Sequence, residues 1–173
     1  NNEMNDVKIY DKNDNLIIER KWDVLQNGST LYKTLYLYCK QFNDKNIKPF
    51  GVAIGTHDGK FGEWVPVVNE ELSDAILCEP TKKQFDKLIN FYGLKPNVLL
   101  KNELITDDGG PTVFYEGGKG YTNSIVKGVI DKWEIEQTYS NLMNSKSINE
   151  LLTKRPDWIH TDVEGYDAKL IMG

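Results

Sequence analysis

The chain has 173 residues, of which 39% are hydrophobic, 11% aromatic and 27% charged. This length and composition are typical of one globular domain with a sizeable core, and they exclude a disordered or fibrous chain. The net charge of −5 argues against a nucleic-acid partner held by neutralised phosphates. No run of about 20 apolar residues occurs, so we expect no segment to span a membrane.

Residues 1–48 are predicted to form an N-terminal appendage. Two β-prone runs flank the turn-rich DKNDN at 11–15, which predicts a hairpin. LYKTLYLYCKQF, at 31–42, is apolar on most faces and predicts a buried or docking helix of about three turns. The only two cysteines, Cys39 and Cys78, are predicted to be buried, reduced thiols, so we expect a cytoplasmic protein.

From residue 49 to residue 173, short apolar runs alternate with helical segments, which is typical of parallel βαβ units. The predicted strands, in order, are residues 50–54, 74–79, 97–101 and 157–163. AILC and VLL within them are continuous apolar runs, as expected for strands buried on both faces of a sheet. We therefore expect an α/β domain with a mostly parallel sheet over 49–173.

Two capping boxes are predicted to start helices, one formed by Thr81 with Gln84 and one by Ser147 with Glu150. Between these helices, ITDDGGPTVFY predicts a hairpin that turns at Asp108–Gly109. The glycine-rich EGGKGYTNS that follows, at 116–124, does not open a helix. We interpret it as a mobile loop, able to close over a substrate, rather than as a phosphate cradle.

Ligands of an open parallel sheet bind beyond the carboxyl ends of its strands, where the strand order reverses. The turn GTHDG follows the first of these strands. Its Gly55 and Gly59 permit positive φ and a close backbone approach to a ligand, and the next helix is expected to present its free N–H groups there. Glu79 lies about 20 residues beyond Gly59, where a carboxylate commonly binds a ribose diol.

The spacing of these glycines narrows the choice of cofactor. GTHDGKFG reads G-x-x-x-G-x-x-G, whereas a nicotinamide-binding turn requires G-x-G-x-x-G and a Walker loop requires four residues between its glycines. The pattern therefore disfavours a pyrophosphate ligand.

The last predicted strand carries His160, Asp162 and Glu164 on one face, because residues two apart in a strand point the same way. Oxygen-rich sets of this kind suit magnesium or calcium, but three residues of one strand rarely surround an ion. We predict no metal site.

The closing HTDVEGYDAKLIMG, at 160–173, resembles the final motif of the FkbM-type S-adenosylmethionine-dependent methyltransferases. IGTHDG at 54–59 resembles the first glycine motif of this family, and CEPTKKQFDKLINFYGLKPNV at 78–98 resembles its E-P-N-x-x-x-F-x-x-L segment with the strand after it. SINELL at 147–152 resembles the segment that precedes the closing motif. The similarity covers roughly residues 50–173.

The resemblance implies a Rossmann-like class I methyltransferase fold, with three αβα layers, and O-methylation of a hydroxyl on a sugar, glycan or small metabolite. The cofactor-binding residues that it implies are Gly55, Thr56, His57, Gly59, Glu79, Asn102, Glu103 and Asp162. The glycine turn would hold the methionine part, Glu79 the ribose and Glu103 the adenine. Asp162 or His160 is expected to accept or orient the hydroxyl proton, and no metal is required.

Two departures from the family pattern keep alternatives open. Ala53 stands where the family usually has an acidic residue, and His160 stands where it has lysine. The first favours a non-catalytic, methyltransferase-like binding module as an alternative, and a nicotinamide-dependent oxidoreductase is a further one. The class I sheet has seven strands, and only about four are predicted here, so we expect the chain to lack the last strands of that fold.

Overall fold

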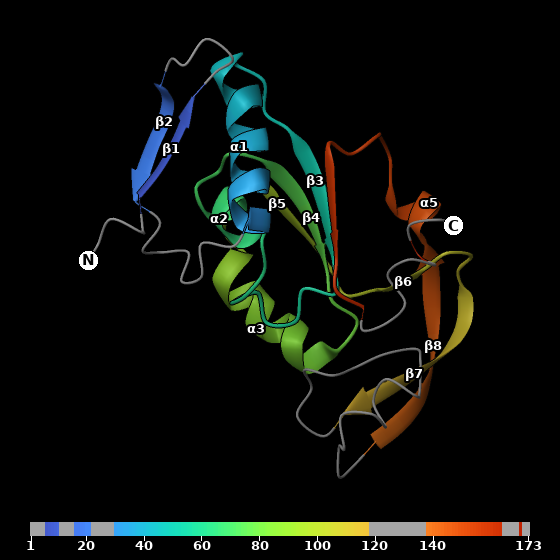
Figure 1. Ribbon diagram of the computed structural model, residues 1–173. Coiled ribbons are helices and arrows are strands. Elements are labelled where there is room, and N and C mark those ends of the chain that lie inside the picture. Colours follow the sequence, from blue (N-terminus) through green and yellow to red (C-terminus); the bar gives the residue numbers. More distant parts are fainter. Residues whose placement is uncertain (1–5, 11–15, 22–29, 118–137, 164–169, 171–173) are drawn as a thin grey trace.

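The computed structural model describes residues 6–10, 16–21, 30–117, 138–163 and 170. Its centre is a four-stranded parallel sheet with the strand order β5-β4-β3-β9 (Figure 1). These strands are β3 (Phe50–Ile54), β4 (Asp74–Cys78), β5 (Val98–Lys101) and β9 (Trp158–Thr161). The prediction of an α/β fold with a mostly parallel sheet is therefore confirmed.

The two middle strands, β3 and β4, are buried on both faces. Ala53 and Leu77 belong to a core cluster on one side of the sheet, whereas Val52, Ile54 and Ile76 belong to a second cluster on the other side. This alternation with a period of two explains why both strands are continuously apolar in sequence.

Three helices cover one face of the sheet: α1 (Thr30–Asp44), α2 (Val65–Asn69) and α3 (Lys82–Tyr92) (Figure 1). The short α5 (Ile148–Leu151) packs against the other face. The helix predicted at the N-terminus buries one side only, through Tyr36 and Cys39, while Tyr38 is exposed. Since α1 contributes to the main core, the boundary at residue 48 stays a prediction.

A second, three-stranded sheet has the order β6-β8-β7 and is formed by β6 (Leu104–Thr106), β7 (Gly110–Gly117) and β8 (Thr138–Ser147). The predicted hairpin between β6 and β7 is wrong, because β8 lies between them, parallel to β6 and antiparallel to β7. The turn still forms, with Gly109 at φ +76° beside the backbone of Ser145 and Ser147. The hydroxyls of Thr106, Ser145 and Thr112 then connect the three strands.

The N-terminal hairpin is confirmed as β1 (Asp6–Tyr10) paired with β2 (Leu16–Lys21). Cys39 and Cys78 are buried and form no disulfide, as predicted. The capping box of Ser147 and Glu150 is also present. Most of the predicted glycine-rich loop, from residue 118 to residue 124, lies outside the described residues.

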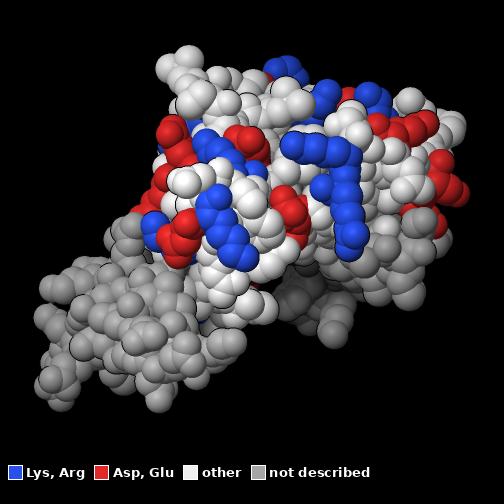
Figure 2. Space-filling view, turned by 90° about the horizontal axis from the view of Figure 1, so that it is seen from above, with Lys and Arg blue, Asp and Glu red and all other residues white. Residues whose placement is uncertain are grey.

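No helix in the described part of the chain is long and apolar enough to cross a membrane. Seen from above, basic and acidic side chains are interspersed over the described part of the surface, with a row of basic side chains beside acidic ones (Figure 2). A local basic surface thus exists on a protein whose net charge is −5.

Gly51 tests the packing of β3 against β9. A Cβ atom on Gly51 would lie 1.7 Å from the Trp158 indole, whose Nε1 donates to Ser73 Oγ at 2.8 Å. We expect Gly51→Ala to lower the free energy of unfolding by about 1–3 kcal/mol, measured by urea denaturation, because of this overpacking. In a Trp158→Leu background the same change should cost less. If Gly51→Ala lowered the free energy of unfolding equally in both backgrounds, overpacking against Trp158 would not be the cause.

Candidate functional site

The strand order reverses between β3 and β9, because β4 and β5 extend the sheet on one side of β3 and β9 on the other. The carboxyl ends of β3 and β9 are joined by a hydrogen bond from the Asp162 N–H to Ile54 O at 2.9 Å. Gly55 packs directly on this connection, since a Cβ atom there would lie 2.2 Å from Asp162 O. The predicted edge is thus the switch point at which open α/β sheets bind ligands.

The glycine turn after β3 is held by the end of β4. The N–H groups of Gly55 and Thr56 both donate to Cys78 O, at 2.9 and 3.2 Å. Gly55, His57 and Gly59 all have positive φ, and His57 is the strained one because it carries a side chain. The next helix, α2, begins only at Val65, so it does not present N–H groups at the turn as predicted.

Gly59 anchors the turn on α3. A Cβ atom there would lie 2.5 Å from Tyr92 and 2.6 Å from Leu88, and the Tyr92 hydroxyl donates to Gly59 O at 2.7 Å. The missing side chains of Gly55 and Gly59 therefore leave room for protein atoms, and their role is to shape the turn.

Glu79 connects this turn to the start of α3. It is 2% exposed, its Oε1 accepts the His57 N–H at 2.9 Å, and its Oε2 accepts the N–H and hydroxyl of Thr81 at 2.8 and 2.6 Å. Burial raises the pKa of Glu79, and the hydrogen bonds from Thr81 and His57 partly oppose this effect.

The predicted capping box of Thr81 and Gln84 is wrong. Thr81 occupies the N-cap position of α3, but its side chain makes no capping hydrogen bond. Its hydroxyl is instead turned toward Glu79 and donates to that carboxylate. The Gln84 side-chain oxygen is buried with no partner in the described part of the protein.

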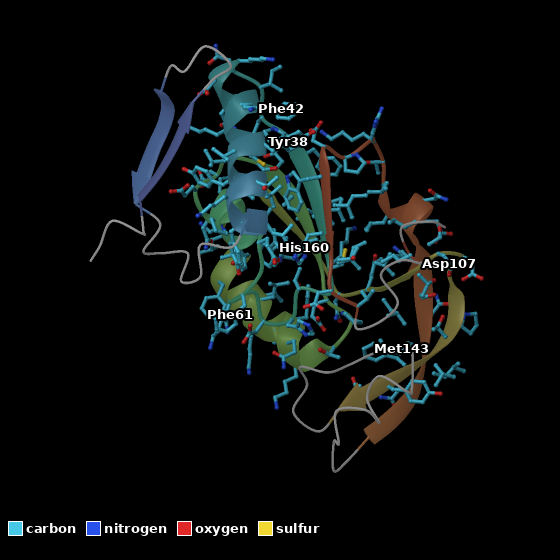
Figure 3. The ribbon with its side chains drawn as sticks, in the orientation of Figure 1. Tyr38, Phe42, Phe61, Asp107, Met143 and His160 are labelled. Carbon is cyan, nitrogen blue, oxygen red and sulfur yellow. The ribbon has the colours of Figure 1, made fainter. Side chains whose placement is uncertain are left out.

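Both histidines lie beside carboxylates at the switch point. The imidazole of His57 lies between Glu79 and Asp162, with Nδ1 4.0 Å from Glu79 Oε1 and Nε2 3.7 Å from Asp162 Oδ2. The Asp162 side chain is 52% exposed, so it is open to a ligand at this edge. His160 Nε2 instead hydrogen-bonds Glu63, from the loop before α2. His160 lies near the middle of the molecule in Figure 3.

Asn102 and Glu103 follow β5 but have different surroundings. The Asn102 amide donates to the carbonyls of Glu79 and Pro80 at 2.8 and 3.1 Å, which attaches this segment to the glycine-turn side of the site. Glu103 Oε1 pairs with Lys146 Nζ of β8 at 2.8 Å and raises the pKa of that lysine. Glu103 Oε2 is buried without a hydrogen-bond partner among the described residues.

Of the three residues considered as metal ligands, His160 and Asp162 are described, and Glu164 lies outside the described residues. Within the residues that are described, no group of three or more His, Cys, Asp or Glu side chains could hold a metal ion.

Sequence reasoning missed three partners in the site: Glu63, Thr81 as a donor, and Lys146. Thr81 left a local signal, because a hydroxyl two residues beyond Glu79 is well placed to bond its carboxylate. Glu63 and Lys146 left none, since each meets its partner only through the tertiary fold.

The comparisons with known proteins add no relative. No protein-family model matches the chain, and no significant match was found among curated proteins or solved structures.

The buried Glu79 should make stability depend on pH. Its raised pKa means that, above the ordinary value of 4.5, the folded protein binds more protons than the unfolded chain, so the free energy of unfolding falls as pH rises through this window. A Glu79→Gln variant lacks this titration. The stability of the wild type relative to Glu79→Gln should thus decrease above pH 4.5, measured by urea unfolding, with the exposed Glu70→Gln as control. If the stability of the wild type relative to Glu79→Gln instead rose with pH, burial would not be the main effect on the pKa of Glu79.

Proposed function

We propose that this protein is an S-adenosylmethionine-dependent methyltransferase of the class I fold that methylates a hydroxyl on a sugar or small metabolite. The observation that carries the proposal is the glycine turn at the reversal of strand order, bounded by Glu79 on one side and Asp162 on the other. This arrangement supports the proposal because the glycine turn, Glu79 and Asp162 each lie within a segment that resembles a motif of the methyltransferase family.

The residues at the adenine end fit the cofactor. Glu103 Oε2 is buried and lacks a donor among the described residues, and a buried acceptor without a partner is costly. The exocyclic amine of adenine is a donor of the required kind. Asn102 is exposed beside it and would border the same ring.

The carboxylate of Glu79 fits the ribose part of the cofactor. Glu79 accepts two hydrogen bonds on Oε2 and the His57 N–H on Oε1, and a carboxylate oxygen has two lone pairs. One ribose hydroxyl can therefore be accepted by Oε1 without breaking the turn. The turn residues Gly55, Thr56, His57 and Gly59 would border the methionine part.

S-adenosylmethionine, when bound, supplies a methyl group on a positively charged sulfur. The protein must then align the acceptor oxygen, exclude water and take a proton. Asp162 is suited to accept the proton, since it is half-exposed at the carboxyl edge of the sheet while His57 lies 3.7 Å away and balances its charge when protonated. His160 is engaged with Glu63, which suits it to a positioning role.

A non-catalytic binding module is the second candidate. Two observations favour it: Ala53 is buried in the core and offers no carboxylate, and Glu79 is only 2% exposed. Such a module would bind no S-adenosylmethionine. A nicotinamide-dependent oxidoreductase remains disfavoured by the glycine spacing.

Calorimetric titration tests the cofactor. We expect saturable binding of S-adenosylmethionine and of its demethylated product, and none of NAD. Glu103→Ala should weaken binding by about tenfold or more through the lost hydrogen bond. Lys146→Ala is the matched control, because it removes the ion pair on Oε1 and leaves Oε2 in place. A folded protein that binds no S-adenosylmethionine would refute the methyltransferase and favour the binding module.

Turnover tests the proton acceptor, with an acceptor found by screening hydroxylated sugars and metabolites. Asp162→Asn should lower turnover by about a hundredfold, with S-adenosylmethionine affinity measured separately. His160→Gln should have a smaller effect, because His160 acts through Glu63 in this assignment. If His160→Gln lowered turnover more than Asp162→Asn, the proton acceptor would be His160 and not Asp162.

A further inference from the structure

The outward side of α3 carries basic and apolar side chains together. Lys83, Lys87, Phe91 and Leu94 follow the spacing of one helical stripe, Leu94 lying just beyond the last residue of the helix. Phe91 is 51% exposed and Leu94 is fully exposed. Exposed apolar side chains that gather in one patch with a polar rim are a feature of surfaces that bind a partner.

The tip of the glycine turn extends this stripe. Lys60 Nζ lies 6.0 Å above the ring of Phe91, within the range of a cation–π contact, and the next residue, Phe61, is 77% exposed. Figure 3 shows Phe61 beside α3, on the side of the molecule away from the β6-β8-β7 sheet. We call the resulting surface the basic–apolar face; it consists of Lys60, Phe61, Lys83, Lys87, Phe91 and Leu94.

The turn is a firm support for its part of this face. Gly59 fits closely against Leu88 and Tyr92, and the Tyr92 hydroxyl donates to Gly59 O at 2.7 Å. Lys60 and Phe61 are thereby held next to α3, so the apolar and basic groups of the two segments form one surface.

The face is positively charged on a protein that is acidic overall. No ion pair joins Lys60, Lys83 or Lys87 to a carboxylate of the described residues, whereas the neighbouring Lys82 pairs with Asp86 at 2.8 Å. The positive charge of the face is therefore open to an external anion.

We propose that the basic–apolar face binds the surface of a bilayer that contains anionic lipids. Lysines attract anionic headgroups, and phenylalanine and leucine insert at the boundary between headgroups and acyl chains. This inference does not depend on the proposed enzyme activity.

Vesicle co-sedimentation of the whole protein tests the proposal. We expect binding to phosphatidylcholine vesicles with about 30% phosphatidylserine, little binding to phosphatidylcholine alone, and weaker binding as salt is added. The double variant Lys83→Glu, Lys87→Glu should reduce the affinity by roughly tenfold or more. The double variant Phe61→Ser, Leu94→Ser should weaken binding even at low salt, because it removes the inserting groups.

Two matched controls change exposed residues elsewhere: Lys45→Glu, after the end of α1, and Leu142→Ser on β8. Each should bind like the wild type, with an unchanged melting temperature. Absence of binding to anionic vesicles, or an equal loss in the control variants, would overturn the proposal. Binding to soluble polyglutamate or duplex DNA without binding to vesicles would also overturn it, and would assign the face to an acidic macromolecule.

Discussion

The carboxylate of Glu79 is the interaction on which the site depends. A buried charge is costly unless hydrogen-bond donors surround it, and here the donors come from two segments, His57 in the glycine turn and Thr81 at the start of α3. Neither segment can move away without leaving the charge unsatisfied. The turn is therefore held in a strained conformation, with positive φ at His57, which places the imidazole beside Asp162.

Rigidity of the turn has an effect on both of its sides. At the carboxyl edge of the sheet, it keeps His57 between two carboxylates, where its charge state affects both of them. Toward α3, it supports Lys60 and Phe61 at the surface. One buried carboxylate thus supports both the polar edge with His57 and Asp162 and the part of the basic–apolar face formed by Lys60 and Phe61.

Much of the fold could be predicted because its signals are local. The strand at 50–54 was predicted with the bounds observed for β3, since its apolar run is continuous and a glycine turn ends it. The capping box of Ser147 and Glu150 forms with both of its hydrogen bonds. The same pattern at Thr81 failed, and there the hydroxyl is turned toward the buried carboxylate of Glu79. The β6–β7 hairpin failed because β8, far along the chain, occupies the position between them.

The candidate site was predictable only in part for the same reason. The residues at the strand ends, Gly55, Glu79 and Asp162, follow from the rule that parallel strands end at one edge. The partner of His160 does not, because Glu63 lies 97 positions earlier in the chain and nothing local links them. Glu103 was expected beside a ligand, whereas its pairing with Lys146 depends on where the second sheet lies.

The pairing of β9 with β3 also has a consequence for the order of folding. The hydrogen bond from the Phe50 N–H to the Asp157 carboxylate joins residues 107 positions apart. The strand that follows Asp157, β9, is the last of the described strands. Closing so long a loop is slow relative to the local pairings of β3, β4 and β5. During synthesis, β3 and β4 therefore have all their sequence available long before β9 (Trp158–Thr161) does. The edge that β3 shares with β9 is completed only after β9 has been synthesised, when β3, β4 and β5 can already be paired.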